Sequence, residues 1–149
     1  DILPLYSAAG PASPGVAPAR REGFEKDMKR ALRASRSAGE WVLVSVHWGK
    51  ERQRESTPRQ RRLGRSLIDW GAHVVIGHHT HVLGEVEQYK RGWIHYSLGN
   101  FVGPWGKRAD VGVWEVVFQP DVPIRQRLVM RRWDGSPRPP ARPARKRRR

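Results

Sequence analysis

The spacing of apolar residues changes along the chain, and each change predicts a different element. Between residues 22 and 38, apolar side chains such as Phe24 and Met28 recur every four residues among Lys and Arg. This period predicts an amphipathic helix. Residues 41–47 form an almost unbroken apolar, β-branched run, which is typical of a buried strand.

A second helix, near residues 58–70, carries a start signal in its sequence. Thr57 can cap the first turn, Pro58 suits the first helical position, and Gln60 can return a hydrogen bond to the cap. Residues 73–77 then form a short apolar run that predicts a second buried strand. The order helix, strand, helix, strand, with short connections, favours an α/β fold with neighbouring parallel strands.

Beyond residue 81 the pattern predicts only strands, separated by segments rich in turn residues. The predicted strands lie near residues 82–88, 93–98, 111–118 and 124–132. Residues 1–20 are rich in Pro, Ala and Gly and predict an irregular connection. Residues 134–149 contain Arg and Pro without an apolar period, so we expect them to be disordered. We therefore predict one domain over residues 1–133, followed by a disordered basic tail.

Composition narrows the classes of function. The 149 residues include no cysteine, which excludes disulfides, thiolate metal sites and cysteine nucleophiles. The net charge is +15, of which residues 134–149 contribute +6. This charge favours an anionic partner, and a nucleic-acid-binding module is one hypothesis. The seven Trp mostly fall within apolar patterns, however, which indicates core positions rather than base-stacking platforms.

Histidines gather at the ends of the two predicted parallel strands. His47 closes the first strand, and His78, His79 and His81 follow the second. Because the carboxyl ends of adjacent parallel strands meet at one edge of a sheet, these imidazoles are expected to come together. Neutral imidazole is a common ligand for transition metals, so His47, His79 and His81 predict a metal site. His78 either orients a ligand or only shapes the turn, whereas His73 and His95 are predicted to be structural.

Four segments, in this order, resemble the CapA family of bacterial capsule (poly-γ-glutamate) synthesis proteins. They are residues 44–51 (VSVHWGKE), the helix segment from Thr57 through residues 67–72 (LIDWGA), residues 74–83 (VVIGHHTHVL) and residues 96–102 (YSLGNFV). That family is similar to the calcineurin-like metallophosphoesterases. The resemblance implies the C-terminal half of a two-sheet metallophosphoesterase-like α/β sandwich. It also implies a place in the cell envelope or outside the cytoplasm.

The resemblance implies a metal-ligand set as well. Such proteins hold two divalent ions, of the Mn, Zn or Fe type, with ligands from five segments. His47 matches the fourth segment, and His79 and His81 match the fifth, so that His47 and His79 would serve one ion and His81 the other. The first three segments have no match here, and the missing N-terminal half of the fold is an expected partner. Thr80 replaces a common Pro in the family, while His73 and His95 stand where Asp and Phe are common.

The activity implied for a complete protein is metal-dependent hydrolysis, in which bound cations activate water. Glu51, four residues after His47, is either an acid–base group or a solvated loop carboxylate. Asn100 is either a polar substrate contact or a turn-shaping residue. An anionic capsule polymer or another envelope component is the expected partner. A non-catalytic envelope scaffold with the same fold is the alternative, and the sequence leaves open whether the protein is an enzyme.

Overall fold

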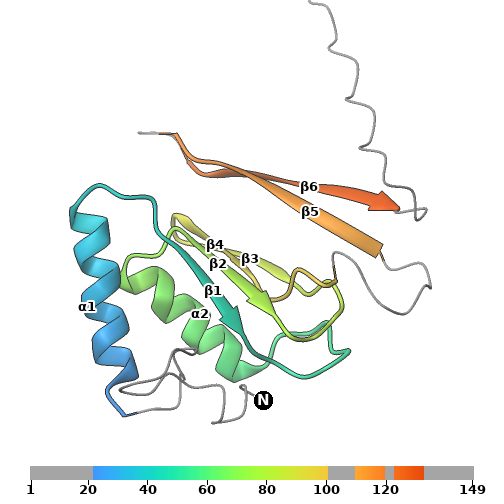
Figure 1. Cartoon of the computed structure of the whole chain (residues 1–149), viewed down its shortest axis with the longest axis horizontal. Coiled ribbons are helices and arrows are strands. Elements are labelled where there is room, and N and C mark those ends of the chain that lie inside the picture. The colour runs from blue at the N-terminus through green and yellow to red at the C-terminus, as the bar shows by residue number, and fades with distance from the viewer. Residues whose placement is uncertain (1–21, 101–109, 120–122, 133–149) are drawn as a thin grey trace, which may run out of the picture.

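The computed structural model of the chain describes residues 22–100, 110–119 and 123–132 (Figure 1). Two helices and six strands follow one another in these ranges. In chain order they are α1 (Phe24–Ser37), β1 (Leu43–His47), α2 (Pro58–Trp70), β2 (Val74–His78), β3 (Val86–Tyr89), β4 (Gly92–His95), β5 (Asp110–Val117) and β6 (Arg125–Arg132).

Local sequence explains where the two helices begin and end. α1 buries Leu32 and is followed by Gly39 at φ 79°, a left-handed conformation that glycine adopts without strain. α2 begins with a complete capping box. The Gln60 amide donates to the Thr57 hydroxyl at 3.3 Å, and the Gln60 side chain accepts from the Thr57 amide at 2.9 Å. Pro58 occupies the first helical turn, where its missing N–H is not needed.

The strands form two separate sheets. The larger one has the order β1–β2–β4–β3, in which β1, β2 and β4 are parallel and β3 is antiparallel to β4. Within the described residues, β5 and β6 pair with each other alone, as an antiparallel ribbon. The register of the first pair sets His47 opposite His78, so the histidine-bearing ends of β1 and β2 lie side by side.

The described part of the chain is layered, with helices on one face of the larger sheet and the β5–β6 ribbon over the other (Figure 1). Alternation along β4 supplies both faces: Ile94 packs in the core, while His95 lies against Trp114 of the ribbon at 4.4 Å between ring centroids. The main hydrophobic core consists of Leu32, Val42, Trp48, Leu67, Ile68, Ala72, Val75, Ile94 and Tyr96.

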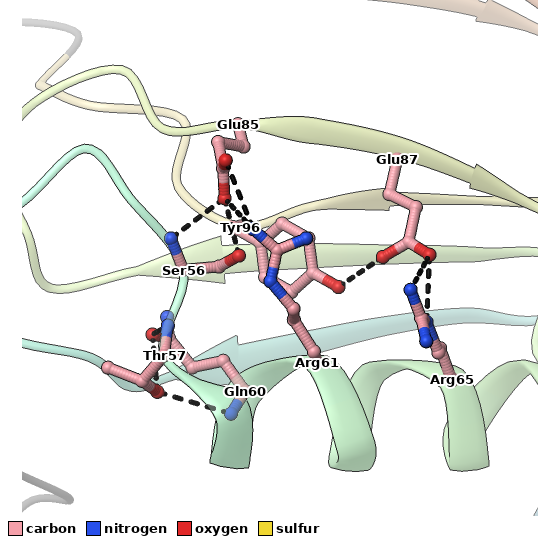
Figure 2. Close-up of polar contacts among 8 residues, drawn as sticks. All are labelled: Ser56, Thr57, Gln60, Arg61, Arg65, Glu85, Glu87 and Tyr96. Atoms are coloured by element: carbon pink, nitrogen blue, oxygen red, sulfur yellow. Dashed lines mark hydrogen bonds and ion pairs between the residues drawn. The ribbon is translucent and has the colours of Figure 1, made fainter.

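Charged side chains connect α2 to β3 and to the residue just before it, on the helix side of the sheet (Figure 2). Arg61 of α2 pairs with Glu85 at 2.8 Å, and Arg65, one turn later, pairs with Glu87 at 2.8 Å. The buried Tyr96 donates its hydroxyl to the same Glu87 carboxylate at 2.6 Å. The helix is therefore held to the sheet by polar contacts at its margin as well as by the core beneath it.

The predicted α/β class and the predicted order of helices and strands are confirmed. Adjacent parallel pairing of the first two strands is also confirmed. The predicted strand at 82–88 begins only at Val86, because the preceding residues form a loop in which Leu83 makes one isolated bridge to Leu98. The expected tail at 134–149 lies outside the described residues.

β1 differs from the buried strand that its apolar sequence predicts. It lies at the edge of the larger sheet as described, with β2 as its one neighbour there. Its side chains are accordingly exposed or half-buried, and Leu43 keeps 49% of its surface in contact with solvent. An apolar run thus reports correctly that a strand forms, but it does not report how many neighbours the strand has.

Candidate functional site

The two parallel strand ends bring His47 and His79 into direct contact. The Nε2 atom of His47 lies 2.9 Å from Nδ1 of His79, and the two ring centroids are 4.7 Å apart. When two imidazole nitrogens bind the same tetrahedral Zn²⁺-type ion, each at about 2.1 Å, the two nitrogens lie roughly 3.4 Å from each other. The observed separation is slightly shorter, so a small opening of the pair would fit two ligands of a single ion.

His81 lies at the edge of this pair and faces Asn100. Its ring centroid is 6.4 Å from that of His79, and its Nδ1 is 2.8 Å from Oδ1 of Asn100. With the Asn100 oxygen as the acceptor, Nδ1 carries the proton and Nε2 keeps a free lone pair. Asn100 therefore fixes the His81 tautomer that can bind a metal through Nε2.

An unusual backbone carries the two histidines that follow β2. His79 has φ 97° and His81 has φ 61°, both in the left-handed region that non-glycine residues seldom occupy. Thr80 between them is buried, and its hydroxyl donates to the Val82 carbonyl and lies 2.8 Å from the Ser97 hydroxyl. These contacts hold the loop in a shape that the sequence alone would disfavour.

The electrostatics of the site favour neutral imidazole. The pKa of His47 lies below its ordinary value, first because burial penalises the charged form and then because His79, His78 and His81 are close. The neutral form is the one that ligates metals, so the surroundings of His47 favour its ligand form at neutral pH.

A buried tryptophan packs directly after the first histidine of the site. Trp48, directly after His47, is 3% exposed and donates its indole N–H to the Tyr96 carbonyl at 2.9 Å. Its ring also stacks on the Tyr96 ring at 5.9 Å. Sequence reasoning placed the tryptophans in the core but did not detect this role, nor that of Thr80. The apolar pattern predicts burial, whereas the Trp48–Tyr96 and Thr80–Ser97 contacts join residues 48 and 17 positions apart.

The remaining predicted site residues are arranged less closely. Glu51 is exposed, and His78 is half-buried at the end of β2. No cluster of three or more His, Cys, Asp or Glu side chains in the described ranges is arranged to hold a metal ion. The described residues therefore fit a metal as a pair of ligands with His81 nearby, and they include no complete coordination sphere.

The two histidines predicted to be structural are both buried in the larger sheet. His73 accepts a hydrogen bond at Nδ1 from the Val42 amide at 2.9 Å, which joins it to the segment before β1. His95 is fully buried beside Gln126 of β6, but neither ring nitrogen makes a hydrogen bond of standard geometry within the described residues. Neither residue belongs to the pair at the strand ends.

Comparison with known proteins identifies the family. The family profile described as bacterial capsule synthesis protein PGA_cap matches residues 4–104. The chain belongs to this family. Within it, the chain is 42% identical over 102 residues to the PGA biosynthesis protein CapA of Bacillus subtilis, covering 68% of this chain and 26% of that protein. It is 35% identical over 102 residues to the capsule biosynthesis protein CapA of Bacillus anthracis, covering 68% of this chain and 25% of that protein.

A more distant relative is a probable polyglutamine synthesis accessory protein of Mycobacterium tuberculosis. It is 31% identical over an alignment of 104 residues, with 67% of this chain and 27% of that protein covered. The chain thus spans about a quarter of the length of the curated relatives it matches. Over the residues that the structure describes, neither helix of this capsule synthesis family member has the length and apolar character needed to cross a bilayer.

Proposed function

We propose that this chain acts in the synthesis of a capsule polymer of the poly-γ-glutamate type, as part of a metal-dependent hydrolase with a metallophosphoesterase-like fold. The contact of His47 and His79 at 2.9 Å, at the carboxyl ends of adjacent parallel strands, is the observation that carries the proposal. The names of the capsule-synthesis relatives supply the process. The proposed place of action is the cell envelope.

The residues of this chain have distinct parts in the proposed centre. His47 and His79 are the two ligands of one divalent ion, and His81, oriented by Asn100, offers Nε2 to a second. When bound, such ions lower the pKa of a coordinated water and neutralise charge on the group under attack. Two hard divalent ions also need carboxylate ligands, which we assign to another part of the fold.

A second candidate is a non-catalytic envelope scaffold that keeps this fold without the chemistry. It is favoured by one observation, namely that the described residues hold no group of three metal-binding side chains. A scaffold needs neither metal affinity nor the His81–Asn100 contact. Metal binding by the histidine pair therefore separates the two candidates.

Calorimetric titration of the 149-residue chain with Mn²⁺ and Zn²⁺ tests the metal site. We expect one weakly bound ion per chain, and no binding by the His47→Ala and His79→Ala variants. His78→Ala is the matched comparison, because it removes an imidazole from the same strand end but not a proposed ligand. It should keep the single site, with affinity reduced about tenfold at most.

Circular dichroism shows whether each variant still folds. Unchanged metal affinity in both ligand variants would contradict the proposed centre and favour the scaffold. Two tight sites, or phosphodiester hydrolysis by this chain alone, would show that the assignment of further ligands elsewhere is wrong.

A further inference from the structure

A second site candidate lies at the end of the larger sheet opposite the histidines. It is a pocket of about 580 Å³ between the C-terminal half of α1, the end of α2, the start of β2 and the β3–β4 turn. His73 precedes β2 and His79 follows it, so the five residues of β2 separate the pocket from the histidine pair. At 3.3 Å per residue this distance is roughly 17 Å.

Positive charge dominates the described lining of this pocket. Arg33, Arg36, Lys90 and Arg91 contribute cations, whereas Asp69 contributes a carboxylate. Asp69 is already paired with Lys90. The pocket therefore keeps three guanidinium groups without an ion pair to any residue in the described ranges.

The neighbourhood responds to this charge. The pKa of His73 lies below its ordinary value, mainly because of burial and next because of the positive charge on Arg36. His73 accepts a hydrogen bond at Nδ1 from Val42, which keeps the imidazole neutral in this wall. Only the Arg36 part of this shift reports a positive potential at the pocket wall, and a positive potential attracts an anion.

Compensation of the helix dipole explains only part of the arrangement. A cation in the last turn of a helix is stabilised by the nearby carbonyl groups, and Arg36 lies in the last turn of α1. That effect fades within one turn. It does not account for Arg33, one turn earlier, nor for Arg91, which comes from the β3–β4 turn on a different element.

The geometry points to a binding site for a carboxylate-bearing polymer, held by Arg33, Arg36 and Arg91. Guanidinium groups bind carboxylates through paired hydrogen bonds, and Arg33 and Arg36, three residues apart on one helix, project side by side. Ile68 and Trp70 provide apolar surface for the methylene groups of the polymer. The choice of a polycarboxylate over other anions rests on the proposed function in capsule synthesis, while the preference for anions rests on the pocket.

Binding of a short, fluorescently labelled γ-linked glutamate oligomer to the full chain tests the site by anisotropy. The combined variant Arg33→Gln, Arg36→Gln, Arg91→Gln should lower the affinity at least ~10-fold, because the loss of each charged hydrogen bond weakens binding several-fold. The matched control is Arg54→Gln, Arg59→Gln, Arg62→Gln. It removes the same charge from exposed positions that do not line the pocket, and should change affinity less than ~3-fold.

Each other outcome has a defined meaning. Equal losses in the two triple variants would show diffuse attraction and overturn the pocket. Tighter binding of polyphosphate or single-stranded DNA through the same arginines would overturn the polycarboxylate assignment. The pocket and the metal centre are tested by separate readouts. An oligomer that does not bind, beside intact metal binding at His47 and His79, would therefore reject the pocket and not the proposed metal centre.

Discussion

At the scale of single residues, Gly77 is a position next to the histidine site where neighbouring atoms leave no space for a side chain. It lies in β2 one residue before His78, and the Trp48 indole passes over its backbone. A Cβ atom added at Gly77 would lie 2.2 Å from the Tyr96 carbonyl oxygen and 2.4 Å from Nε1 of Trp48. The absence of a side chain is what allows the Trp48–Tyr96 hydrogen bond to form across this strand.

Gly77→Ala should therefore lower the free energy of unfolding by about 3 kcal/mol or more, since the contacts are to backbone and to a buried ring. Urea denaturation measures the loss. Gly64→Ala, inside α2, is the milder comparison, because its added Cβ meets side chains and no backbone atom, Ile94 at 3.1 Å and Trp48 at 3.4 Å, and helix propensity improves. A loss at Gly77 no larger than at Gly64 would show that the crowding relaxes easily.

His95 predicts a dependence of stability on pH. Burial lowers the pKa of His95 to about 4, against 6.5 for an exposed histidine. Between about pH 4 and 6.5, His95 is protonated in the unfolded chain but stays neutral in the folded chain. The part of the unfolding free energy that depends on a neutral His95 is thus fully present above about pH 6.5. It is lost as pH falls towards 4, by about 3 kcal/mol in total.

His95→Phe should flatten this part of the pH profile and make the protein more stable than the wild type at pH 5. The phenylalanine fills a similar volume against Trp114 and removes two buried ring nitrogens whose polar neighbour in the described ranges, Gln126, makes no hydrogen bond of standard geometry with them. Thermal unfolding from pH 7.5 to 4.5 is the measurement. The burial of neutral His47 and His73 has the same sign, so some slope remains. Parallel wild-type and variant profiles would contradict the assignment to His95.

The sequence was sufficient to predict which histidines lie at the strand ends, because two apolar runs and their order determine that edge. It was not sufficient to predict that Asn100 faces His81, or that Thr80 anchors the loop between the ligands. Those contacts depend on the path of the chain after β4. The left-handed backbone at His79 was likewise not predicted, because a histidine in the sequence does not indicate a positive φ as a glycine does.

At the scale of elements, two kinds of polar interaction hold β3 and the residue before it to their neighbours, one to α2 and one to the residue after β4. Exposed pairs such as Arg61–Glu85 are each worth only about 0.2–1 kcal/mol, because solvent screens them. The hydrogen bond from buried Tyr96 to Glu87 is different, since one partner is only 1% exposed (Figure 2). Burial, followed by the neighbouring Glu87 carboxylate, raises the pKa of Tyr96, so the hydroxyl remains a donor.

Tyr96→Phe should cost about 1–2 kcal/mol of stability. A hydrogen bond to a charged group is worth more than that, but Glu87 keeps its bond to Arg65 after the change. Tyr89→Phe is the matched control, because its hydroxyl makes only a long 3.4 Å contact to Asp69. Its expected effect is within about 0.5 kcal/mol in urea denaturation. Similar losses for both variants would place the effect in general packing rather than in the Tyr96–Glu87 bond.

Element boundaries were predictable where the sequence carries a signal at the boundary itself. The capping box at Thr57 and Gln60 located the start of α2. The strand near 82–88 was placed too early, because the apolar residues Val82 and Leu83 belong to the loop that Thr80 and Ser97 hold. Alternation of apolar residues does not distinguish a strand from a loop whose side chains pack inward. The exposed edge position of β1 was hidden for the related reason that burial depends on neighbours.

At the scale of the whole molecule, the β5–β6 ribbon is attached through side chains rather than through backbone pairing. In the described ranges it shares no ladder with the larger sheet. Contacts of the ribbon and its flanking residues within the described ranges include Trp114 against His95, Phe118 against Trp41 and His73, and the Trp93 indole N–H donated to the Ile124 carbonyl at 3.0 Å. Few side chains thus join two layers that are each hydrogen-bonded within themselves, which is the condition for sub-global opening.

Native-state hydrogen exchange should therefore show the amides of β5 and β6 opening at lower free energy than those of β2 and β4. Trp114→Ala should accelerate exchange in the ribbon more than ~10-fold, because it removes a large half-buried anchor, and should change β2 little. Val113→Ala is the control. Val113 is the residue before Trp114 in β5, is 42% exposed and points to the opposite face of the ribbon. It should leave ribbon exchange nearly unchanged. If both layers exchange at one free energy, and Trp114→Ala accelerates them together, the ribbon and the larger sheet are a single cooperative unit and the layered view of stability is wrong.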